Sequence, residues 1–173
     1  MRFDVPANAK LREVVDTDHE WLVDLHNDPD VLMNLTDPRP ITLESHLAWW
    51  ESVRASQKDK RLIFEIDGTP IGFSKFYAID RINQNCTLGA DVHREHRGRG
   101  HAKLMWALML DVCFSELGMH RVALSTAEYN LIAQRLYLGL GFKIEGTMRE
   151  CVFRNDRFYD GICMYMLRKD WLG

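Results

Sequence analysis

The segment from residue 93 to residue 103 reads His-Arg-Glu-His-Arg-Gly-Arg-Gly-His-Ala-Lys and leads directly into a run with helical apolar spacing. Such a segment must form a tight turn that opens a helix. Its glycines, Gly98 and Gly100, lack the Cβ atoms that would keep a ligand away from the backbone, and the first N–H groups of a helix have no acceptor within it. The arginines and the lysine of the segment add positive charge beside the positive end of the helix dipole. The sequence therefore predicts a site for a ligand with adjacent phosphates.

The basic turn is a local feature, because the chain as a whole is mildly acidic. Its 173 residues carry a net charge of −3 and 46% of them are hydrophobic, which is enough for one domain with a full core. We therefore expect a single domain over residues 1–173 and no nucleic-acid partner. No apolar run approaches the ~18 residues of a membrane span, and the N-terminus lacks a hydrophobic signal region. These features predict a soluble, cytoplasmic protein with no membrane partner.

Neither disulfides nor a metal site are expected. The cysteines show no Cys-x-x-Cys spacing, and most lie among apolar neighbours. Ordinary reduced cysteines are expected at Cys86, Cys113, Cys151 and Cys163. The imidazoles of His93, His96 and His101 are of a kind that binds zinc, but two arginines stand among them and would repel a cation. No paired acid supports such a site, so we expect no metal.

Alternation, helical spacing and turn residues predict seven strands and four helices. The expected strands are 10–15, 61–66, 71–79, 85–92, 121–126, 142–145 and 158–167. The expected helices run from a Thr17-x-x-Glu20 capping box to about residue 27, from Thr42 through Val53, from 101 to 117, and from Asn130 to 140. Leu43, Leu47, Trp50 and Val53 share one face of the second helix. The remaining stretches read as loops, among them a polar turn at 154–157.

The order of these elements predicts a mixed sheet. Asp67-Gly68 is a strong two-residue hairpin signal, so the early strands should be antiparallel. The strand, helix and strand that flank the basic turn should instead form a parallel step. We therefore expect an α/β fold with a mixed sheet of about seven strands and helices on both faces.

Three separated motifs carry a resemblance to a known family. Arg97-x-x-Gly100-x-Ala102 follows a predicted strand and opens a helix, and Asn130 and Leu136-Tyr137-x-x-x-Gly141-Phe142 come after it. Together they resemble the GCN5-related N-acetyltransferase (GNAT) superfamily over nearly the whole chain. The combination is specific, whereas the first motif alone would be a weak signal.

The C-terminal part is most similar to one branch of that superfamily. Its matching segments are Gly141 to Gly146, Met148-Arg149-Glu150, Tyr159-Asp160 and Asp170-Trp171. They look most like the RimJ/RimL acetyltransferases of ribosomal proteins. The segment 41–47 also resembles acetyltransferases that act on nucleotide-linked amino sugars.

The resemblance implies a GNAT fold, in which two central parallel strands splay apart in a V and acetyl-coenzyme A (acetyl-CoA) binds in the gap as a co-substrate. It implies that the backbone of Ala90, Asp91 and Val92 pairs with the pantetheine arm, and that Asn130 contacts the cofactor near the second strand. The residues implied at the pyrophosphate are Arg97, Gly98, Arg99, Gly100, His101, Ala102 and Lys103.

Direct transfer of the acetyl group to an amine needs a proton donor for the leaving sulfur. Tyr137 matches the family's general acid by its position four residues before Gly141-Phe142, although its spacing also suits a core aromatic residue. A phenol with a reference pKa of ~10 can protonate a thiolate whose thiol has a pKa of roughly 8.5, if the two lie within hydrogen-bond reach. In this scheme backbone N–H groups near Val92 polarise the carbonyl, and no cysteine nucleophile is needed.

The general base is left open by the sequence. The branch's glutamate position is occupied by Ser125, which cannot take the proton of an ammonium alone. Asp91, Glu128, Glu145, a water chain or an amine with a low pKa are the alternatives. Asp91 interrupts an apolar strand and could bind an incoming ammonium, but it also reads as a solvent-facing strand residue.

The acceptor amine is also open. A protein N-terminus, an amino-sugar nucleotide, a polyamine and a small antibiotic amine present the same nucleophile. The segments expected to shape its pocket are 28–40 and 145–157, with Trp49 or Trp50 as a further wall, and strand 158–167 is a candidate for pairing in a homodimer. Two other classes remain: a catalytically silent acetyl-CoA sensor or interaction module, and a nucleic-acid-binding protein using the cluster from Arg94 to Lys103.

Overall fold

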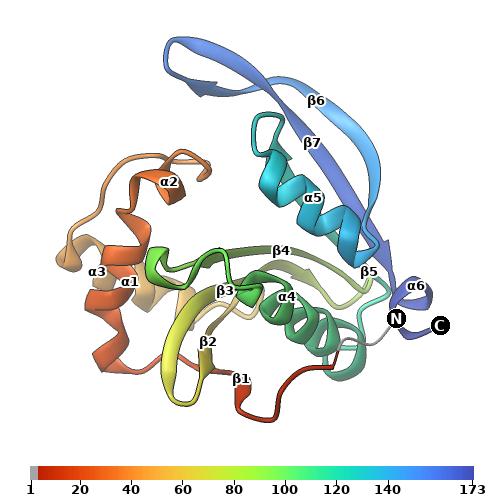
Figure 1. The fold of residues 1–173 in the computed structure, drawn as a ribbon, viewed down its shortest axis with the longest axis horizontal. Helices are drawn as coiled ribbons and strands as arrows, with labels where there is room; N and C mark the ends of the chain where they lie inside the picture. The colour runs from red at the N-terminus through yellow and green to blue at the C-terminus, as the bar shows by residue number, and fades with distance from the viewer. Residues whose placement is uncertain (1–3) are drawn as a thin grey trace.

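The computed structural model describes residues 4–173 and contains one seven-stranded mixed sheet with the strand order β1-β2-β3-β4-β5-β7-β6 (Figure 1). The strands are β1 (Ala9–Glu13), β2 (Lys60–Ile66), β3 (Thr69–Asp80), β4 (Asn85–Val92), β5 (Arg121–Ala127), β6 (Lys143–Arg154) and β7 (Arg157–Leu167). The helices are α1 (His19–His26), α2 (Pro29–Leu32), α3 (Leu43–Arg54), α4 (His101–Asp111), α5 (Leu131–Leu140) and α6 (Arg168–Leu172). The expected mixed α/β fold is confirmed.

The N-terminal half of the sheet follows from its turns. Asp67 and Gly68 both have positive φ, at 51° and 77°, and they join β2 to β3 in the tight hairpin that the dipeptide predicts. Strands β1 to β4 are antiparallel neighbours, and β4 pairs with β5 in parallel. The parallel step through the basic turn is therefore also confirmed.

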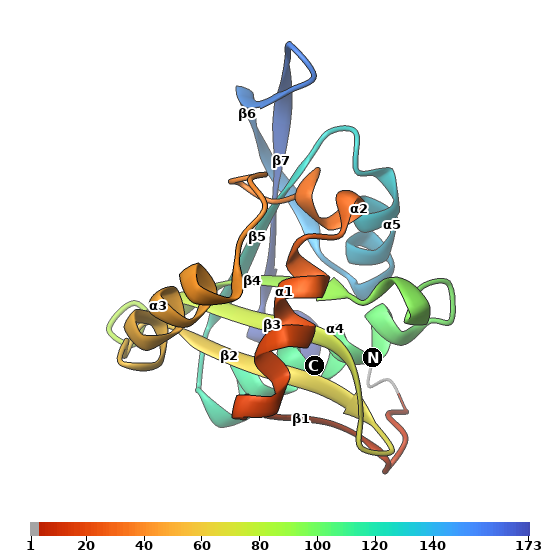
Figure 2. The same cartoon turned by 90° about the vertical axis from the view of Figure 1, so that its left-hand side faces the viewer.

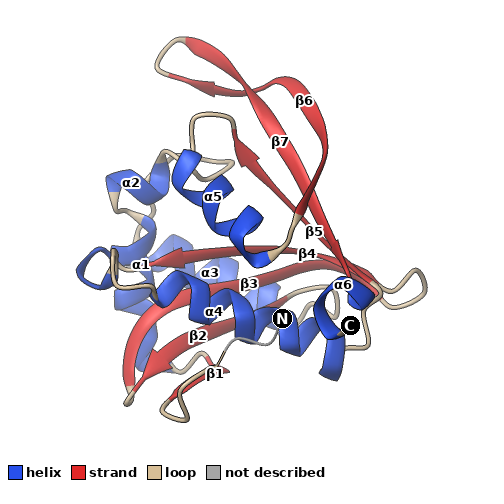
Figure 3. Ribbon diagram, turned by 45° about the vertical axis from the view of Figure 1, so that its right-hand side comes forward, coloured by secondary structure: helices blue, strands red, loops and turns tan. Residues whose placement is uncertain are grey.

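Helices cover both faces of the sheet (Figures 2 and 3). On one face, Leu22 and Leu25 of α1 pack with Ile63 and Phe73. On the other face, α4 and α5 pack over the larger core, which includes Met105, Trp106, Phe64, Phe76 and Leu88. Adjacent strand residues such as Ile63 and Phe64 point to opposite faces, so burying both requires a helix layer on each side.

The parallel strands β4 and β5 pair only at one end. Their register covers Asn85↔Arg121, Cys86↔Val122 and Thr87↔Ala123, after which the pairing stops. Strand β4 nevertheless continues to Val92, paired on its other side with β3, and β5 continues to Ala127, paired with β7. The strands therefore splay, as the resemblance implied. From Leu88 to Val92 the edge of β4 that faces β5 pairs with no strand among residues 4–173, although Val92 O accepts a hydrogen bond from the Arg97 Nε.

Strands β6 and β7 form a long arm with α5 along its inner side (Figure 1). The expected strand 142–145 is too short, since β6 runs to Arg154. The tip of the arm reaches back across the molecule, because the Arg154 guanidinium donates to the carbonyls of Met33 and Leu35. The Tyr129 hydroxyl also donates to Met33 O, at 2.5 Å. These contacts hold the loop that follows α2.

One local expectation is wrong, and two others hold in part. No side-chain cap at Thr17 opens α1; the Asp18 carboxylate instead accepts from the Val15 N–H. In α3 the Thr42 hydroxyl does accept from the Ser45 N–H, as a cap should, but Leu43 and Leu47 are about two-fifths exposed and the buried residue is His46. The third expected helix, 101–117, ends in a π-helical segment over Val112–Glu116.

All four cysteines are free thiols in the structure. Within residues 4–173, no helix has both the length and the apolar character needed to cross a bilayer.

Candidate active site

The gap between the splayed strands contains a cavity of about 980 Å³. Its walls come from β4, β5, the start and inner face of α4, α5 and the loop that follows α2. Of the residues predicted for the site, those that line this cavity are Ala90, Asp91, Val92, Arg97, Ala102, Ser125, Asn130 and Tyr137. The structure therefore brings together residues that lie up to 47 positions apart in the sequence, counting from Ala90 to Tyr137.

The basic turn stands at the mouth of this cavity. Gly98, Arg99, Gly100, His101 and Lys103 do not line the cavity themselves, but they join Arg97 and Ala102, which do. Gly98 and Gly100 have φ of 74° and 80°, and no atom lies within 4 Å of an added Cβ at either position. This left-handed conformation is easily adopted only by glycine.

The backbone amides of this turn are available to a ligand. The first hydrogen bond inside the helix is donated by the Lys103 N–H to Gly100 O, at 3.0 Å. Of the described residues, none accepts a hydrogen bond from the N–H groups of residues 98 to 102. These five amides lie at the positive end of α4, an arrangement that is chemically suited to an anion.

Arg97 is expected to bind the pyrophosphate, but in the structure its guanidinium pairs with two carboxylates. Its guanidinium lies 3.2 Å from Asp28 Oδ2 and 2.9 Å from Asp30 Oδ2, and its Nε donates to Val92 O. These contacts connect α2 to the end of β4, so the Arg97 charge is already balanced by carboxylates. Arg99 is exposed and forms no ion pair within residues 4–173. The amides and Arg99, rather than Arg97, offer the uncompensated positive potential.

Tyr137 lies on the inner wall of the cavity. Its ring is buried against Trp106, with centroids 4.7 Å apart, and against Phe142 at 6.0 Å. Burial, followed by the negative charge of Asp91, raises the pKa of the Tyr137 hydroxyl well above its usual value. The hydroxyl is therefore protonated throughout the neutral range. It hydrogen-bonds to no other described residue, which leaves the proton available to a ligand.

Asn130 and Ser125 face the same cavity from the β5 side. The Asn130 side-chain oxygen caps α5 by accepting from the Ala133 N–H at 3.2 Å, so its NH₂ group is the part left for a ligand. Ser125 is an exposed residue of β5, opposite Cys163 of β7.

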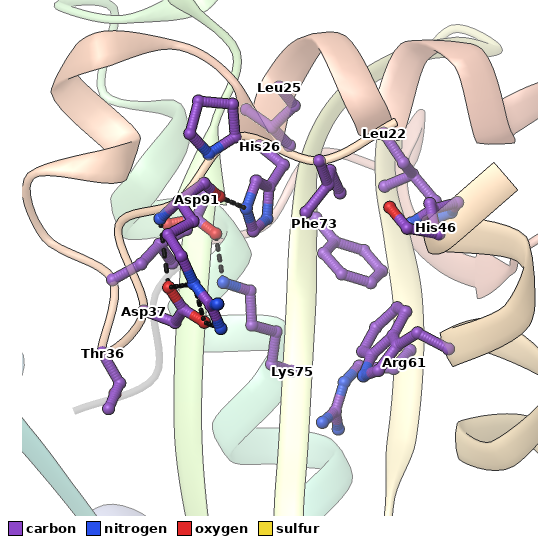
Figure 4. A pocket seen from close by; sticks show the side chains of 16 residues that line it. Leu22, Leu25, His26, Thr36, Asp37, His46, Arg61, Phe73, Lys75 and Asp91 are labelled. Atoms are coloured by element: carbon purple, nitrogen blue, oxygen red, sulfur yellow. Dashed lines mark hydrogen bonds and ion pairs between the residues drawn. The ribbon is translucent and has the colours of Figure 1, made fainter. Parts of the chain in front are cut away.

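A second cavity, of about 700 Å³, adjoins the first (Figure 4). Its apolar wall is formed by Leu22, Leu25, Leu35, Ile41, Trp49 and Phe73. The residues common to both linings are Leu35, Thr36, Arg61, Lys75 and Asp91. Of the segment 28–40, which is expected to shape the acceptor pocket, residues 35–37, 39 and 40 line this cavity, as does Trp49, whereas no residue of 145–157 lines either one.

Asp91 stands at the junction of the two cavities. Its carboxylate forms an ion pair with the Lys75 ammonium, which reaches it from β3 (Figure 4). The strand register places Phe73 opposite Asp91 and Lys75 opposite Gly89, so the pair is a diagonal cross-strand contact. Asp91 is therefore neither a free carboxylate nor a simple solvent-facing residue.

The other carboxylates considered as bases lie outside both cavities. Glu128 Oε1 accepts from the Asp160 N–H at 3.1 Å, and Glu145 forms a 2.5 Å ion pair with Arg121. Neither residue lines a cavity. Asp91 is thus the best-placed of the three candidate acids.

One group of side chains in this region has metal-ligand spacing, namely His93, Glu95 and His96. Both ring nitrogens of His93 already have partners: Nε2 contacts Asp24 Oδ2 at 3.0 Å, and Nδ1 accepts from the Glu95 N–H at 3.4 Å. Trp21 stacks on the same ring. His93 therefore connects α1 to the basic turn.

Sequence reasoning missed the polar residues of the second cavity. Lys75 and Arg61 appear in the sequence as ordinary charges of alternating strands. His46 follows Leu43 by three residues and precedes Trp50 by four, so it lies on the same face of α3 as these apolar residues. Side chains alternate between the two faces along β3 and β4. This alternation, together with the register of the two strands, could have placed Lys75 beside Asp91. The helical spacing of α3 could have revealed His46, because position 46 falls on the face that Leu43, Trp50 and Val53 share.

His46 gives a prediction for stability against pH. Burial, followed by the nearby His19 and His26, lowers the pKa of His46 to about 4, and its Nε2 lies 3.0 Å from His19 Nδ1. In the unfolded chain the pKa returns to ~6.5, so between about pH 6.5 and 4 the unfolded state binds the extra proton. The contribution of neutral His46 to the free energy of unfolding is thus fully present above pH 6.5. We expect the free energy of unfolding to fall by about 1–3 kcal/mol on acidification to pH 4.

The measurement is chemical denaturation of the wild type and His46→Gln across this range. The variant should show a flatter decline of unfolding free energy with falling pH. His120→Gln, at an exposed histidine, is the control and should follow the wild type. Parallel wild-type and His46→Gln profiles would contradict the prediction.

Known proteins with similar sequences agree with the arrangement of this site. The sequence model described as an acetyltransferase (GNAT) domain matches residues 9–143. The chain is 28% identical over 145 residues to the uncharacterized SPbeta prophage-derived N-acetyltransferase YokL of Bacillus subtilis, covering 83% of this chain and 82% of that protein. It is 27% identical over 157 residues to the L-amino acid N-acetyltransferase AaaT of Escherichia coli, covering 89% and 94%.

A solved structure shares the fold. The spermidine N-acetyltransferase from Vibrio cholerae, determined in complex with CoA and spermine, superposes with a TM-score of 0.92 at 24% identity, covering 97% of this chain and all of the other. The two chains therefore have the same overall fold.

Proposed function

Because the chain belongs to the acetyltransferase (GNAT) domain family, we propose that it transfers the acetyl group of acetyl-CoA directly to the primary amine of a small molecule. One observation carries this proposal: the unpaired edge of β4, the free amides of residues 98 to 102 and the Tyr137 hydroxyl all surround or adjoin one cavity. A pantetheine chain can add to the edge of β4 as a strand would, while its diphosphate lies on the amides at the start of α4.

Each residue then has a role in the transfer. Acetyl-CoA supplies a thioester when it is bound. Backbone N–H groups near Val92 polarise its carbonyl oxygen, and the Asp91 carboxylate attracts the ammonium of the acceptor to the cavity junction. After that ammonium has lost a proton to solvent, its nitrogen bonds to the acyl carbon and the carbon–sulfur bond breaks. The Tyr137 hydroxyl donates its proton to the departing sulfur, and the nitrogen releases its second proton to solvent as the amide forms, while solvent returns a proton to the Tyr137 oxygen.

A small-molecule acceptor is favoured over a ribosomal protein N-terminus. Similar proteins include enzymes named for L-amino acid and spermidine acetylation, both of which use small primary amines. The second cavity also has a limited volume of about 700 Å³ and is bordered by the loop that Arg154 holds in place. Mass spectrometry of products from a panel of small amines and ribosomal N-terminal peptides tests this choice; acetylation of the peptides alone would overturn it.

Binding of acetyl-CoA should depend on the left-handed turn. We expect Gly100→Ala to weaken acetyl-CoA binding at least about tenfold, because its Cβ would stand where the diphosphate approaches the amides. Isothermal titration measures the dissociation constant. Gly118→Ala is a matched control, since Gly118 also has a positive φ (68°) and open surroundings but lies at the far end of the α4 segment. Both variants should lose similar stability, so equal losses of affinity would contradict the role of Gly100.

A further inference from the structure

The junction between the two cavities carries the Lys75–Asp91 pair and a second cation, Arg61, which is already paired with Asp59 at 3.0 Å. Lys75 and Asp91 form an ion pair there, and both side chains line both cavities. Their side chains are about one-fifth exposed, so a ligand can reach them. The Lys75 ammonium has three donors and the Asp91 carboxylate has several acceptor positions, so each retains hydrogen-bonding capacity beyond their mutual contact.

The remaining acids of the cavity walls are also matched by cations. Asp30 pairs with Arg97 at 2.9 Å, Asp37 with Arg39 at 2.5 Å, and Asp59 with Arg61 at 3.0 Å. Among the described residues, no Asp or Glu of either lining lacks a basic partner. A polycation would find no uncompensated carboxylate here, and displacing the existing cations would leave them unpaired near the cavity.

We infer that the acceptor is a zwitterionic α-amino acid with an apolar side chain, a conclusion that rests on the proposed acetyl transfer. An α-amino acid carries an ammonium and a carboxylate on adjacent atoms, and this arrangement is the complement of the Lys75–Asp91 pair. Its ammonium meets Asp91 and its carboxylate meets Lys75. Polyamines instead present ammonium groups separated by several methylenes, which require acids at matching intervals.

The apolar wall of the second cavity specifies the side chain. Leu25, Leu35 and Phe73 line it beside the ion pair. An apolar side chain that enters this space is removed from water, at about 25 cal/mol for each Å² buried. His46, on the same lining, adds no charge at neutral pH, because burial lowers its pKa to about 4. The acceptor therefore gains affinity from one apolar group and from one pair of charges.

A matched set of acceptors tests this inference. CoA release is measured with L-leucine, L-leucinamide and spermidine for the wild type, Lys75→Met and Lys75→Arg. Leucine and its amide share the amine and the side chain, but only leucine has the carboxylate. We expect kcat/KM of the wild type for leucine to exceed those for leucinamide and spermidine about tenfold or more.

The lysine variants distinguish recognition from structural support. Lys75→Met should lower kcat/KM for leucine about tenfold or more and change that for leucinamide little, so the preference for the acid disappears; Lys75→Arg should retain it. Lys143→Met is the control, because Lys143 is also an ion-paired lysine but lies outside both cavities, and it should behave as the wild type. Acetyl-CoA affinity, measured for every variant, verifies the fold.

The outcomes separate this inference from the proposed function. A wild type that acetylates spermidine in preference to leucine would overturn the inference while preserving acetyl transfer. An acid-to-amide ratio that Lys75→Met does not change would also overturn it. A wild type that binds no acetyl-CoA would instead remove the proposed function, and the inference with it.

Discussion

Tyr137→Phe is expected to lower kcat about a hundredfold or more, because the leaving sulfur loses its proton donor. The substitution removes one oxygen and keeps the ring, so the contacts with Trp106 and Phe142 remain. The KM for acetyl-CoA should change little, since the phosphate-binding amides are not touched. Steady-state CoA release at saturating concentrations of both substrates measures the effect.

A second tyrosine provides the control. Tyr165 lies on β7, where Arg121 packs over its ring at 4.9 Å, and it lines neither cavity. Tyr165→Phe should therefore retain wild-type turnover. If Tyr137→Phe also retained it, the hydroxyl would not be the general acid and Tyr137 would be a packing residue.

Trp106→Ala is expected to have the largest effect on stability. The Trp106 side chain is 1% exposed and packs edge-to-face with both Tyr137 and Phe142. Its truncation leaves a cavity in the core that joins α4 to α5, so the free energy of unfolding should fall by about 3–5 kcal/mol. Urea denaturation measures the loss, and any folded variant should also show weakened turnover because Tyr137 loses its support.

Trp49→Ala is the matched control for stability. Trp49 is about two-fifths exposed on α3, so its truncation removes few buried contacts and should change the unfolding free energy by less than about 1 kcal/mol. Equal destabilisation by the two substitutions would contradict the assignment of Trp106 to the core.

Much of the fold could be predicted because local signals and tertiary structure agree. The dipeptide Asp67-Gly68 closes the hairpin between β2 and β3, and Asn130 caps α5 through the Ala133 N–H. The strand before the basic turn was predicted with its observed bounds, Asn85–Val92. In each case the residue type has one strongly preferred backbone role, so little depends on distant contacts.

The length of β6 could not be predicted for a physical reason. Most of its residues are exposed, so no alternation of apolar residues marks it. Its pairing with β7 also shifts register between Met148 and Val152, where Glu150 has a φ of 49°. An exposed, bulged strand is specified by its partner strand rather than by its own sequence.

The candidate site was predictable only in part for a similar reason. The basic turn is a local motif, and it appears where the sequence placed it. The partner of Asp91, in contrast, depends on the register of β3 with β4, and the carboxylates that occupy Arg97 come from α2, a four-residue helix that the sequence presented as a loop. Side-chain pairs formed across such distances are set by the tertiary structure.

The central claim is that the free amides of residues 98 to 102 hold the diphosphate of acetyl-CoA in the gap between β4 and β5. Titration of ¹⁵N-labelled protein with acetyl-CoA, followed by amide proton shifts, tests it most directly. We expect saturable shifts that are largest at residues 98 to 102 and accompanied by shifts at Leu88 to Val92. Binding that leaves both segments unchanged, or no binding at millimolar acetyl-CoA, would contradict it.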